Sequence, residues 1–259
     1  MSITTQILTT TFNLRIFPRQ IPQFRGAVVD KVMALKEIFE REGISTDLFH
    51  NHENEANAEL PLLFRYPLIQ YQWHSQHATI TGINEGARAL ALLLQNNDGQ
   101  IQMHQKTLPF GLTGFPQIQM VSLQQTEQFH EYRLYKWLAL NQENFKIWEG
   151  LETFRERLDL LERILESQLI MVLQKLGKPV AERWELQTQI TDFGKSDWTE
   201  CHNTRLRAFD LTFRCKATLP PNIGLGKAVA FGFGKQIPHL KRKNTPNKVQ
   251  TIEEQVMND

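Results

Sequence analysis

The feature that most constrains the fold is a helical repeat in the second half of the chain. Apolar side chains recur there every three or four residues, at Leu151, Phe154, Leu158, Leu161, Leu165, Leu169, Val172 and Leu176. This spacing places them on one face of an α-helix, which another element must then cover. Gly177 and Pro179 end the pattern, and Gly150 is a candidate for an earlier break.

The segments around this helix have the character of strands. Two precede it, at 118–123 and 129–140, and two follow it, at about 185–191 and 206–217. In the last of them Phe209, Leu211 and Phe213 share one face, as expected for a strand with one buried side. The second half is therefore predicted to be an α+β unit.

The first half alternates strands and helices in a defined order. The expected elements are a strand at 6–16, a helix at 26–42, strands at 62–73 and 77–81, a helix capped by Asn84, and a strand at 101–108. This β-α-β-β-α-β order is the ferredoxin-like, or split βαβ, arrangement. A stretch rich in glycine and proline follows at 109–116, and we interpret it as the linker to the second half.

Composition restricts both the size of the fold and the kind of binding site. A chain of 259 residues suits one large domain or two of ordinary size. With 41% hydrophobic residues it has enough apolar material for a core, and its formal net charge is only +1. Any nucleic-acid site must therefore be a local basic patch and not a property of the whole surface.

Cysteine usage and hydropathy indicate the cellular compartment. The cysteines, Cys201 and Cys215, are too few and too far apart for a disulfide framework or a zinc site, which suggests a reducing environment. No signal peptide is visible after Met1, and no apolar run approaches the roughly 18 residues that span a bilayer. We therefore expect a cytoplasmic protein with no membrane segment.

A glycine-rich segment at 224–235, with the sequence GLGKAVAFGFGK, carries the clearest binding motif. It has a Gly-x-Gly pair at each end of a short apolar run, and a lysine follows each pair. Glycine lets the backbone approach a ligand closely, exposed N–H groups suit phosphate oxygens, and lysine adds charge. The alternative is a β-hairpin whose glycines serve only tight turns and bulges.

Several stretches together resemble a known family. The segment 206–235, with its strand, Leu-Pro turn and GLGKAVAFGFGK, resembles the C-terminal glycine-rich loop of CRISPR-associated RAMP proteins. Within that superfamily the chain is most similar to the repeat-processing endoribonucleases of the sixth numbered Cas family. Further similar stretches are LFHNH at 48–52, FRYPLIQY at 64–71, TGINEG at 81–86 and YKWLALN at 135–141.

The resemblance implies both an architecture and an activity. The architecture is two tandem ferredoxin-like (RRM-like) domains, at 1–110 with the catalytic segment and at 117–240 with the RNA-binding loop, followed by a polar tail at 241–259. The activity is cleavage of precursor CRISPR RNA within its repeats to give mature guide RNAs, with no cofactor or metal. The partner would be CRISPR repeat RNA, and other Cas proteins of an effector complex or a second copy in a homodimer could join it.

RNA can be cut without metal when its own 2′-OH attacks the adjacent phosphate, giving a 2′,3′-cyclic phosphate and a 5′-OH. The enzyme then moves protons and stabilises charge, and histidine suits the proton transfers. The resemblance places the catalytic histidine in the polar segment that contains His50 and His52, and their spacing does not decide between them. The alternative is a solvated loop pair or a weak metal site. Lower candidates are Lys36 for charge, and Tyr66 and Tyr71 for orienting the ribose or stacking on a base.

The predicted RNA-binding residues combine the glycine-rich segment with basic side chains of the preceding strand. They are Gly224, Gly226, Lys227, Gly232, Gly234, Lys235, Arg205, Arg207, Arg214 and Lys216. Arg205 and Arg207 share one strand face, as do Arg214 and Lys216, so they could form basic pairs along a groove. The alternative is that these arginines only keep a sheet face solvated.

Three other functions fit parts of the sequence. A non-catalytic RAMP-type subunit would hold CRISPR RNA without cutting it. A ferredoxin-like protein-interaction module would assemble through the long helix, and its glycines would be purely structural. A metal-dependent nuclease or phosphatase would need a ligand cluster, for which His50, His52, Glu53 and Glu55 are the local candidates.

Overall fold

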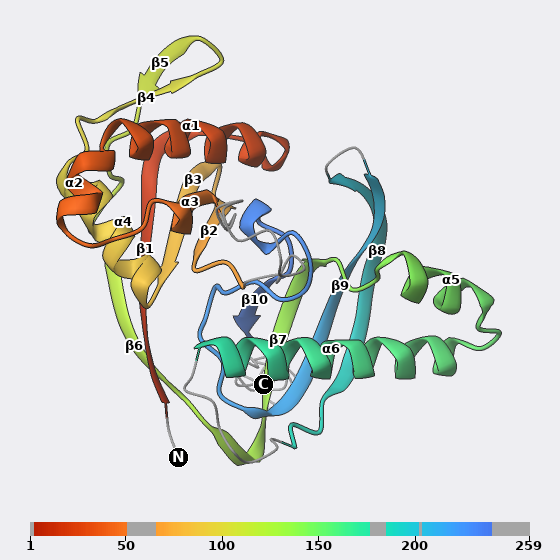
Figure 1. Ribbon diagram of the computed structural model, residues 1–259. Helices are drawn as coiled ribbons and strands as arrows, with labels where there is room; N and C mark the ends of the chain where they lie inside the picture. The colour runs from red at the N-terminus through yellow and green to blue at the C-terminus, as the bar shows by residue number, and fades with distance from the viewer. Residues whose placement is uncertain (1–2, 51–65, 177–184, 202–203, 240–259) are drawn as a thin grey trace, which may run out of the picture.

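The computed structural model describes residues 3–50, 66–176, 185–201 and 204–239 (Figure 1). These residues form two four-stranded antiparallel sheets, one in each half of the chain, together with a separate two-stranded hairpin. Helices accompany both sheets, so the predicted α+β chain with tandem ferredoxin-like domains is confirmed. No helix in this part of the chain is long and apolar enough to cross a membrane.

The first sheet has the strand order β2-β3-β1-β6. Its strands are β1 (Ile3–Arg15), β2 (Ile69–His74), β3 (His77–Ile83) and β6 (Gln117–Leu123). The helices of this half are α1 (Ile21–Ala34), α2 (Lys36–Arg41), α3 (Asp47–His50) and α4 (Glu85–Gln95). Phe24 of α1 and Leu90 of α4 pack in one apolar cluster with Phe12 and Ile80 of the sheet. The helix predicted at 26–42 begins earlier, because Pro22 is tolerated in its first turn.

The fourth strand of this ferredoxin-like unit is β6, and not the predicted strand at 101–108. That segment instead folds back on itself as a hairpin of β4 (Gln100–Met103) and β5 (Lys106–Pro109). His104 and Gln105 both have positive φ, which is the requirement of a tight two-residue hairpin turn. The sequence placed a strand at 118–123 in the second half, whereas this segment, as β6, pairs with β1 of the first sheet.

The predicted linker at 109–116 packs on the first domain. The ring of Phe110 stacks on Phe12 with centroids 3.9 Å apart, and the amide of Thr113 donates to the carbonyl of Thr11 at 2.8 Å. The change from the first sheet to the second occurs later, between Leu123 and the start of β7 (Gln125–Trp137).

The second sheet has the order β10-β7-β9-β8. This is the topology of the first sheet, which reads β6-β1-β3-β2 when written from the same edge. The other strands are β8 (Gln189–Cys201), β9 (Thr204–Ala217) and β10 (Lys235–Pro238), and the helices are α5 (Gln142–Gly150) and α6 (Phe154–Leu176). The break predicted at Gly150 is therefore the end of α5. Between β9 and β10 a ferredoxin-like unit would have its second helix. This chain has there the glycine-rich segment, with only the short 3₁₀ helix η3 (Val229–Phe231).

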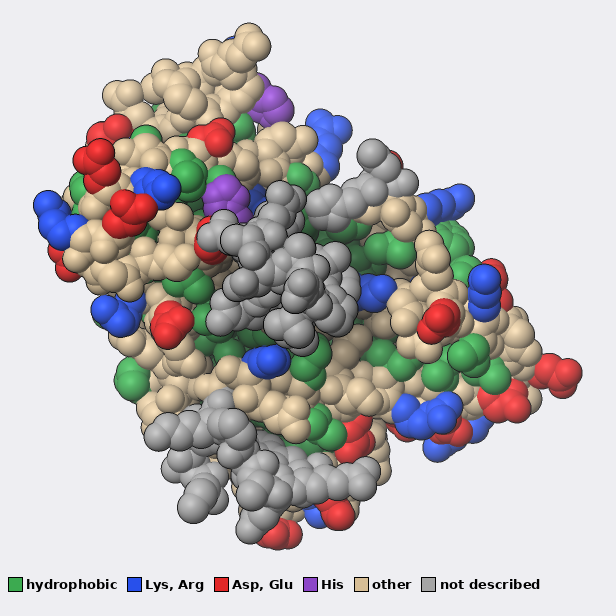
Figure 2. Space-filling model, viewed as in Figure 1, with side chains coloured by type: hydrophobic (Ala, Val, Ile, Leu, Met, Phe, Trp, Pro, Cys, Tyr) green, Lys and Arg blue, Asp and Glu red, His purple; other side chains and the backbone are tan. Residues whose placement is uncertain are grey.

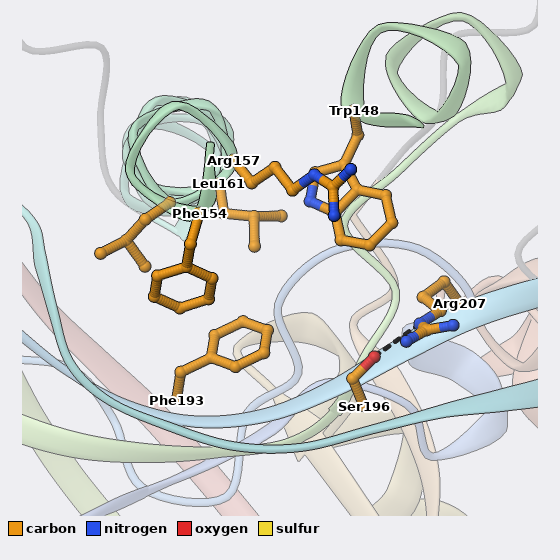
Figure 3. Close-up of a pocket in the computed structure, with 8 residues that line it drawn as sticks. Trp148, Phe154, Arg157, Leu161, Phe193, Ser196 and Arg207 are labelled. Carbon is orange, nitrogen blue, oxygen red and sulfur yellow. Dashed lines mark hydrogen bonds between the residues drawn. The ribbon is translucent and has the colours of Figure 1, made fainter. Parts of the chain in front are cut away.

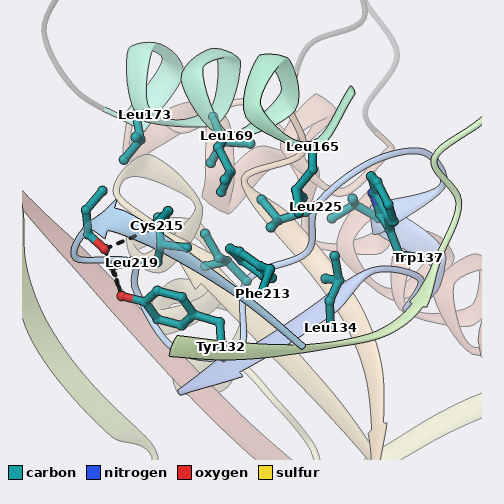
Figure 4. Packing of buried hydrophobic residues seen from close by; sticks show 14 of the residues in the cluster. Tyr132, Leu134, Trp137, Leu165, Leu169, Leu173, Phe213, Cys215, Leu219 and Leu225 are labelled. Carbon is teal, nitrogen blue, oxygen red and sulfur yellow. Dashed lines mark hydrogen bonds between the residues drawn. The ribbon is translucent and has the colours of Figure 1, made fainter. Parts of the chain in front are cut away.

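The apolar stripe of α6 covers one face of the second sheet, as its spacing predicts. Figure 4 shows Leu165 and Leu169 pointing from the helix toward Phe213 and Trp137 of the strands. Leu225 of the glycine-rich segment lies in the same cluster and is fully buried. The segment is therefore part of the core of the second domain.

The first sheet has one face packed against α1 and α4. Its other face is polar and contacts the glycine-rich segment. Gln70 accepts a hydrogen bond from the amide of Gly224 at 2.9 Å, and Gln72 donates to the carbonyl of Asn222 at 2.6 Å. Both glutamine side chains are buried, so each bond compensates for the removal of polar groups from water. Side chains of β2 thus bind the backbone of the second domain and join the two domains.

Candidate functional site

The glycine-rich segment connects β9 to β10 within the second domain, and its two ends pair with each other as in a hairpin, with an antiparallel bridge between Gly224 and Lys235. Gly226 and Gly234 both have positive φ. A Cβ at Gly226 would lie 2.8 Å from the indole of Trp137, and one at Gly234 would lie 1.8 Å from the carbonyl oxygen of Leu225. These two glycines are required by close packing as well as by backbone conformation.

The amides of this segment are mostly used inside the protein. Gly224 donates to Gln70, Gly232 donates to the carbonyl of Val229, and Gly234 donates to the carbonyl of Lys136. The expectation that these N–H groups face a phosphate is therefore wrong for these three glycines.

The two lysines of the segment are better placed for an anion. Lys227 is exposed and Lys235 is partly buried, and neither has a carboxylate partner among the described residues. Burial lowers the pKa of both ammonium groups. A cation that is partly desolvated and lacks a counter-ion gains when an anion binds beside it.

His50 is held at the end of α3, close to the glycine-rich segment. The Arg25 guanidinium of α1 donates to the carbonyl of His50, and its Cζ lies 4.8 Å from the ring centroid of Phe231. The hydroxyl of Tyr71 donates to the preceding carbonyl, that of Phe49, at 3.2 Å. Two successive carbonyls at the C-terminal end of α3 are thus fixed, and a cation there complements the helix dipole. Both α3 and η3 contact α1, although they lie far apart in the chain.

His50 is partly exposed in this position. His52 lies outside the described residues, as do Glu53 and Glu55, so the structure leaves the choice between the histidines open. Among the described residues no group of three or more His, Cys, Asp and Glu side chains could hold a metal ion.

Tyr66 and Tyr71 lie in the interior, which corrects the prediction that they offer a ring to RNA. Both are almost inaccessible to solvent, and burial raises the pKa of each phenol. Tyr66 donates to the carbonyl of Gly224 at 2.9 Å and accepts from the Gln70 amide at the same distance. It joins the domains, whereas Tyr71 positions α3. Lys36 is exposed and lies 3.5 Å from Glu40 in an ion pair one turn along α2.

The four basic residues of β9 divide between the two faces of the second sheet. Arg205 and Arg207 alternate in phase with the buried Phe209 and contact the indole of Trp198, at 4.7 and 5.4 Å from its centroid. Arg214 and Lys216 lie on the other face, where both contact the ring of Phe129, at 4.6 and 5.6 Å. The pairs predicted from spacing exist, but they do not form one groove.

The formal net charge of +1 predicts that no large part of the surface is uniformly basic. On the face seen in Figure 2, Lys and Arg side chains are interspersed with Asp and Glu and form no continuous basic surface. Sequence reasoning missed Arg25, which lies in no motif. It also missed Gln70 and Gln72, although their alternation with apolar residues in β2 was a sign of a polar strand face that something must cover.

The fold and the site define a tandem ferredoxin-like protein whose second domain has a glycine-rich connection in place of a helix. Family models match both halves: the Cas6b N-terminal domain over residues 1–127 and the Cas6b C-terminal domain over residues 124–238. The chain belongs to the Cas6b family of CRISPR repeat-processing endoribonucleases. A comparison with curated protein sequences finds no match.

Several solved structures have a fold similar to that of this chain. A crystal structure of Cas6b has a TM-score of 0.70 and 20% identity, with 92% of this chain and 100% of that chain covered. A crystal structure of the CRISPR RNA processing endoribonuclease Cas6b has a TM-score of 0.63 at 20% identity and the same coverage. Csf5, a type IV Cas6 crRNA endonuclease, has a TM-score of 0.50 and 10% identity over 92% of this chain and 100% of its own.

Proposed function

We propose that this chain cleaves precursor CRISPR RNA within its repeats, without a metal ion, by attack of the 2′-OH on the adjacent phosphate. The products are a 2′,3′-cyclic phosphate and a 5′-OH. The family match supports RNA cleavage. The observation that carries the site assignment is that Arg25 contacts both the carbonyl of His50 and Phe231, because this brings a histidine segment and a basic segment to one place.

His50 or His52 moves the protons of this reaction. A neutral imidazole accepts the proton of the attacking 2′-OH, and an imidazolium donates one to the leaving 5′-oxygen. Arg25 and Tyr71 hold the backbone that carries His50, so the imidazole is presented from a fixed helix end. Lys227 and Lys235 contribute charge beside the RNA backbone, and partial desolvation strengthens that contribution.

The test is cleavage of labelled repeat RNA in excess EDTA, measured under single-turnover conditions. Wild-type protein is expected to cut at one position and to leave a cyclic phosphate on the upstream fragment, identified by mass spectrometry. Loss of the general acid or base should slow the reaction about 10²–10⁴-fold. That loss is expected in one of the variants His50→Ala and His52→Ala, and in the double variant.

His104→Asn is the matched control, because His104 lies in the exposed turn of the β4–β5 hairpin, which Figure 1 shows projecting from the first domain, and asparagine tolerates its positive φ. If both single variants and the double variant cut as fast as wild type, the catalytic assignment is wrong. If wild-type protein binds the repeat tightly and gives no product, the chain acts as an RNA-holding subunit and not as a nuclease.

A further inference from the structure

A cavity lies in the second domain, between helices α5 and α6 on one side and strands β8 and β9 on the other. Its volume is about 180 Å³, whereas one buried water needs about 10–15 Å³. Figure 3 shows the side chains that face it, which include Trp148, Phe154, Arg157, Phe193 and Arg207. Phe154 is 61% exposed, so the cavity opens to the surface at this ring.

The walls of this cavity are aromatic and the rings are braced by arginines. Phe154 and Phe193 meet edge to face with centroids 5.6 Å apart. The guanidinium of Arg157 lies 4.9 Å from the ring centroid of Trp148, and that of Arg207 lies 5.7 Å from it. Such contacts hold the rings and the two cations in fixed positions at little entropic cost to a ligand.

Some hydrogen-bond donors of the residues that line this cavity have no acceptor among the described residues. The indole N–H of Trp148 is buried and has no partner in the described part of the chain. Arg207 uses its Nε to bind the hydroxyl of Ser196 at 2.5 Å, and its terminal nitrogens have no acceptor among the described residues. Arg157 donates its Nε and one terminal nitrogen to the carbonyl of Leu151. The described residues that line the cavity include two arginines and no carboxylate.

We infer that this cavity binds one unpaired base of an RNA strand, with the neighbouring phosphate against Arg207. A flat base packs against the aromatic walls, and the phosphate pairs with the guanidinium. The aromatic rings suit a flat base, and Arg207 with no carboxylate among the lining residues favours a ligand that also carries a negative charge. Aromatic and arginine platforms bind single-stranded nucleotides in this way.

This inference rests on the proposed function at one point, namely that the bound RNA is the CRISPR repeat. The cavity belongs to α5, α6, β8 and β9, whereas the proposed catalytic segment belongs to α1, α3 and η3, and Figure 1 shows α5 well separated from α3. The bound base therefore anchors a nucleotide remote from the cut.

The experiment measures binding of labelled repeat RNA that carries a 2′-deoxy group at the cut, so that no cleavage occurs. Each nucleotide of the RNA is replaced in turn by an abasic one, and affinity is measured by fluorescence anisotropy at fixed salt. For wild type, one unpaired position remote from the cut is expected to lose about 5–100-fold in affinity, as loss of one stacked base does. For Phe154→Ala, the intact RNA should bind correspondingly more weakly, and the abasic change at that position should have little further effect.

Two further variants complete the design. Arg207→Gln should weaken binding of the intact RNA and reduce its salt dependence by about one phosphate contact. Arg155→Gln is the control, because Arg155 is an exposed arginine on the same helix that pairs with Asp159 at 2.9 Å. Phe154 and Arg155 are exposed, so their replacement leaves the fold intact, which thermal unfolding verifies.

The inference is overturned if no abasic position is coupled to Phe154→Ala, or if Arg155→Gln weakens binding as much as Arg207→Gln. Cleavage by wild type together with normal binding by the cavity variants would refute the cavity alone. An absence of both binding and cleavage in wild type would refute the proposed function.

Discussion

Removal of the Tyr66 hydroxyl is expected to weaken the joint between the two domains. In Tyr66→Phe the carbonyl of Gly224 loses the hydroxyl that donates to it at 2.9 Å. The Gln70 amide still donates to the carbonyl of Pro67 at 3.2 Å. One buried acceptor is left without that bond, which costs about 1–3 kcal/mol of the free energy of unfolding. For a chain of this size each kcal/mol lowers Tm by about 2–4 °C, so a decrease of about 2–12 °C is expected.

The assay is thermal unfolding followed by circular dichroism, with Tyr135→Phe as the matched control. Tyr135 is 36% exposed and its hydroxyl makes no hydrogen bond with the described residues, so its loss should leave Tm unchanged. If Tyr66→Phe unfolds within 1 °C of wild type, the buried hydrogen bonds of β2 do not secure the glycine-rich segment, and the account of the joint is wrong.

Three other substitutions test separate parts of the account. Gly234→Ala forces a Cβ toward the Leu225 carbonyl at positive φ and should lower the free energy of unfolding by more than the roughly 1–2 kcal/mol of the backbone conformation alone, measured by urea denaturation. Lys227→Gln should weaken repeat RNA binding and reduce the salt slope by about one unit, with Tm unchanged. The hydrogen bond from Lys31 lowers the pKa of the Asp98 carboxyl. The ion pair therefore stabilises the fold at pH values above the ordinary carboxyl pKa, and this stabilisation is lost as the pH falls through the lowered pKa of Asp98. Asp98→Asn should therefore cost up to about 1 kcal/mol near pH 7 and nothing at the lowest pH, in urea titrations across pH.

Local patterns predicted the secondary structure well, because each depends on neighbouring residues. The apolar spacing of α6 and the alternation of Phe209, Leu211 and Phe213 in β9 are properties of one segment. The sequence could not distinguish the hairpin of β4 and β5 from a single strand, since the turn at His104 and Gln105 has none of the glycine, asparagine or aspartate residues that mark such turns.

The candidate site could be predicted only in part, because its geometry depends on contacts between distant segments. The glycine motif indicated a special backbone but not its partners, which are Gln70 and Trp137. Arg25 has no local pattern, and only the fold brings it to both His50 and Phe231. The tyrosines were chosen as aromatic platforms, whereas burial assigns them to hydrogen bonds inside the protein.

The central claim, attack by the RNA's own 2′-OH, is tested most directly by one change in the substrate. Repeat RNA with a single 2′-deoxy nucleotide immediately upstream of the cut is incubated with wild-type protein in EDTA, beside the unmodified RNA. We expect unmodified RNA to be cut to a cyclic phosphate and the deoxy RNA to bind with the same affinity and remain intact. Cleavage of the deoxy RNA at the same position would contradict the mechanism, because no 2′-OH would be present to attack.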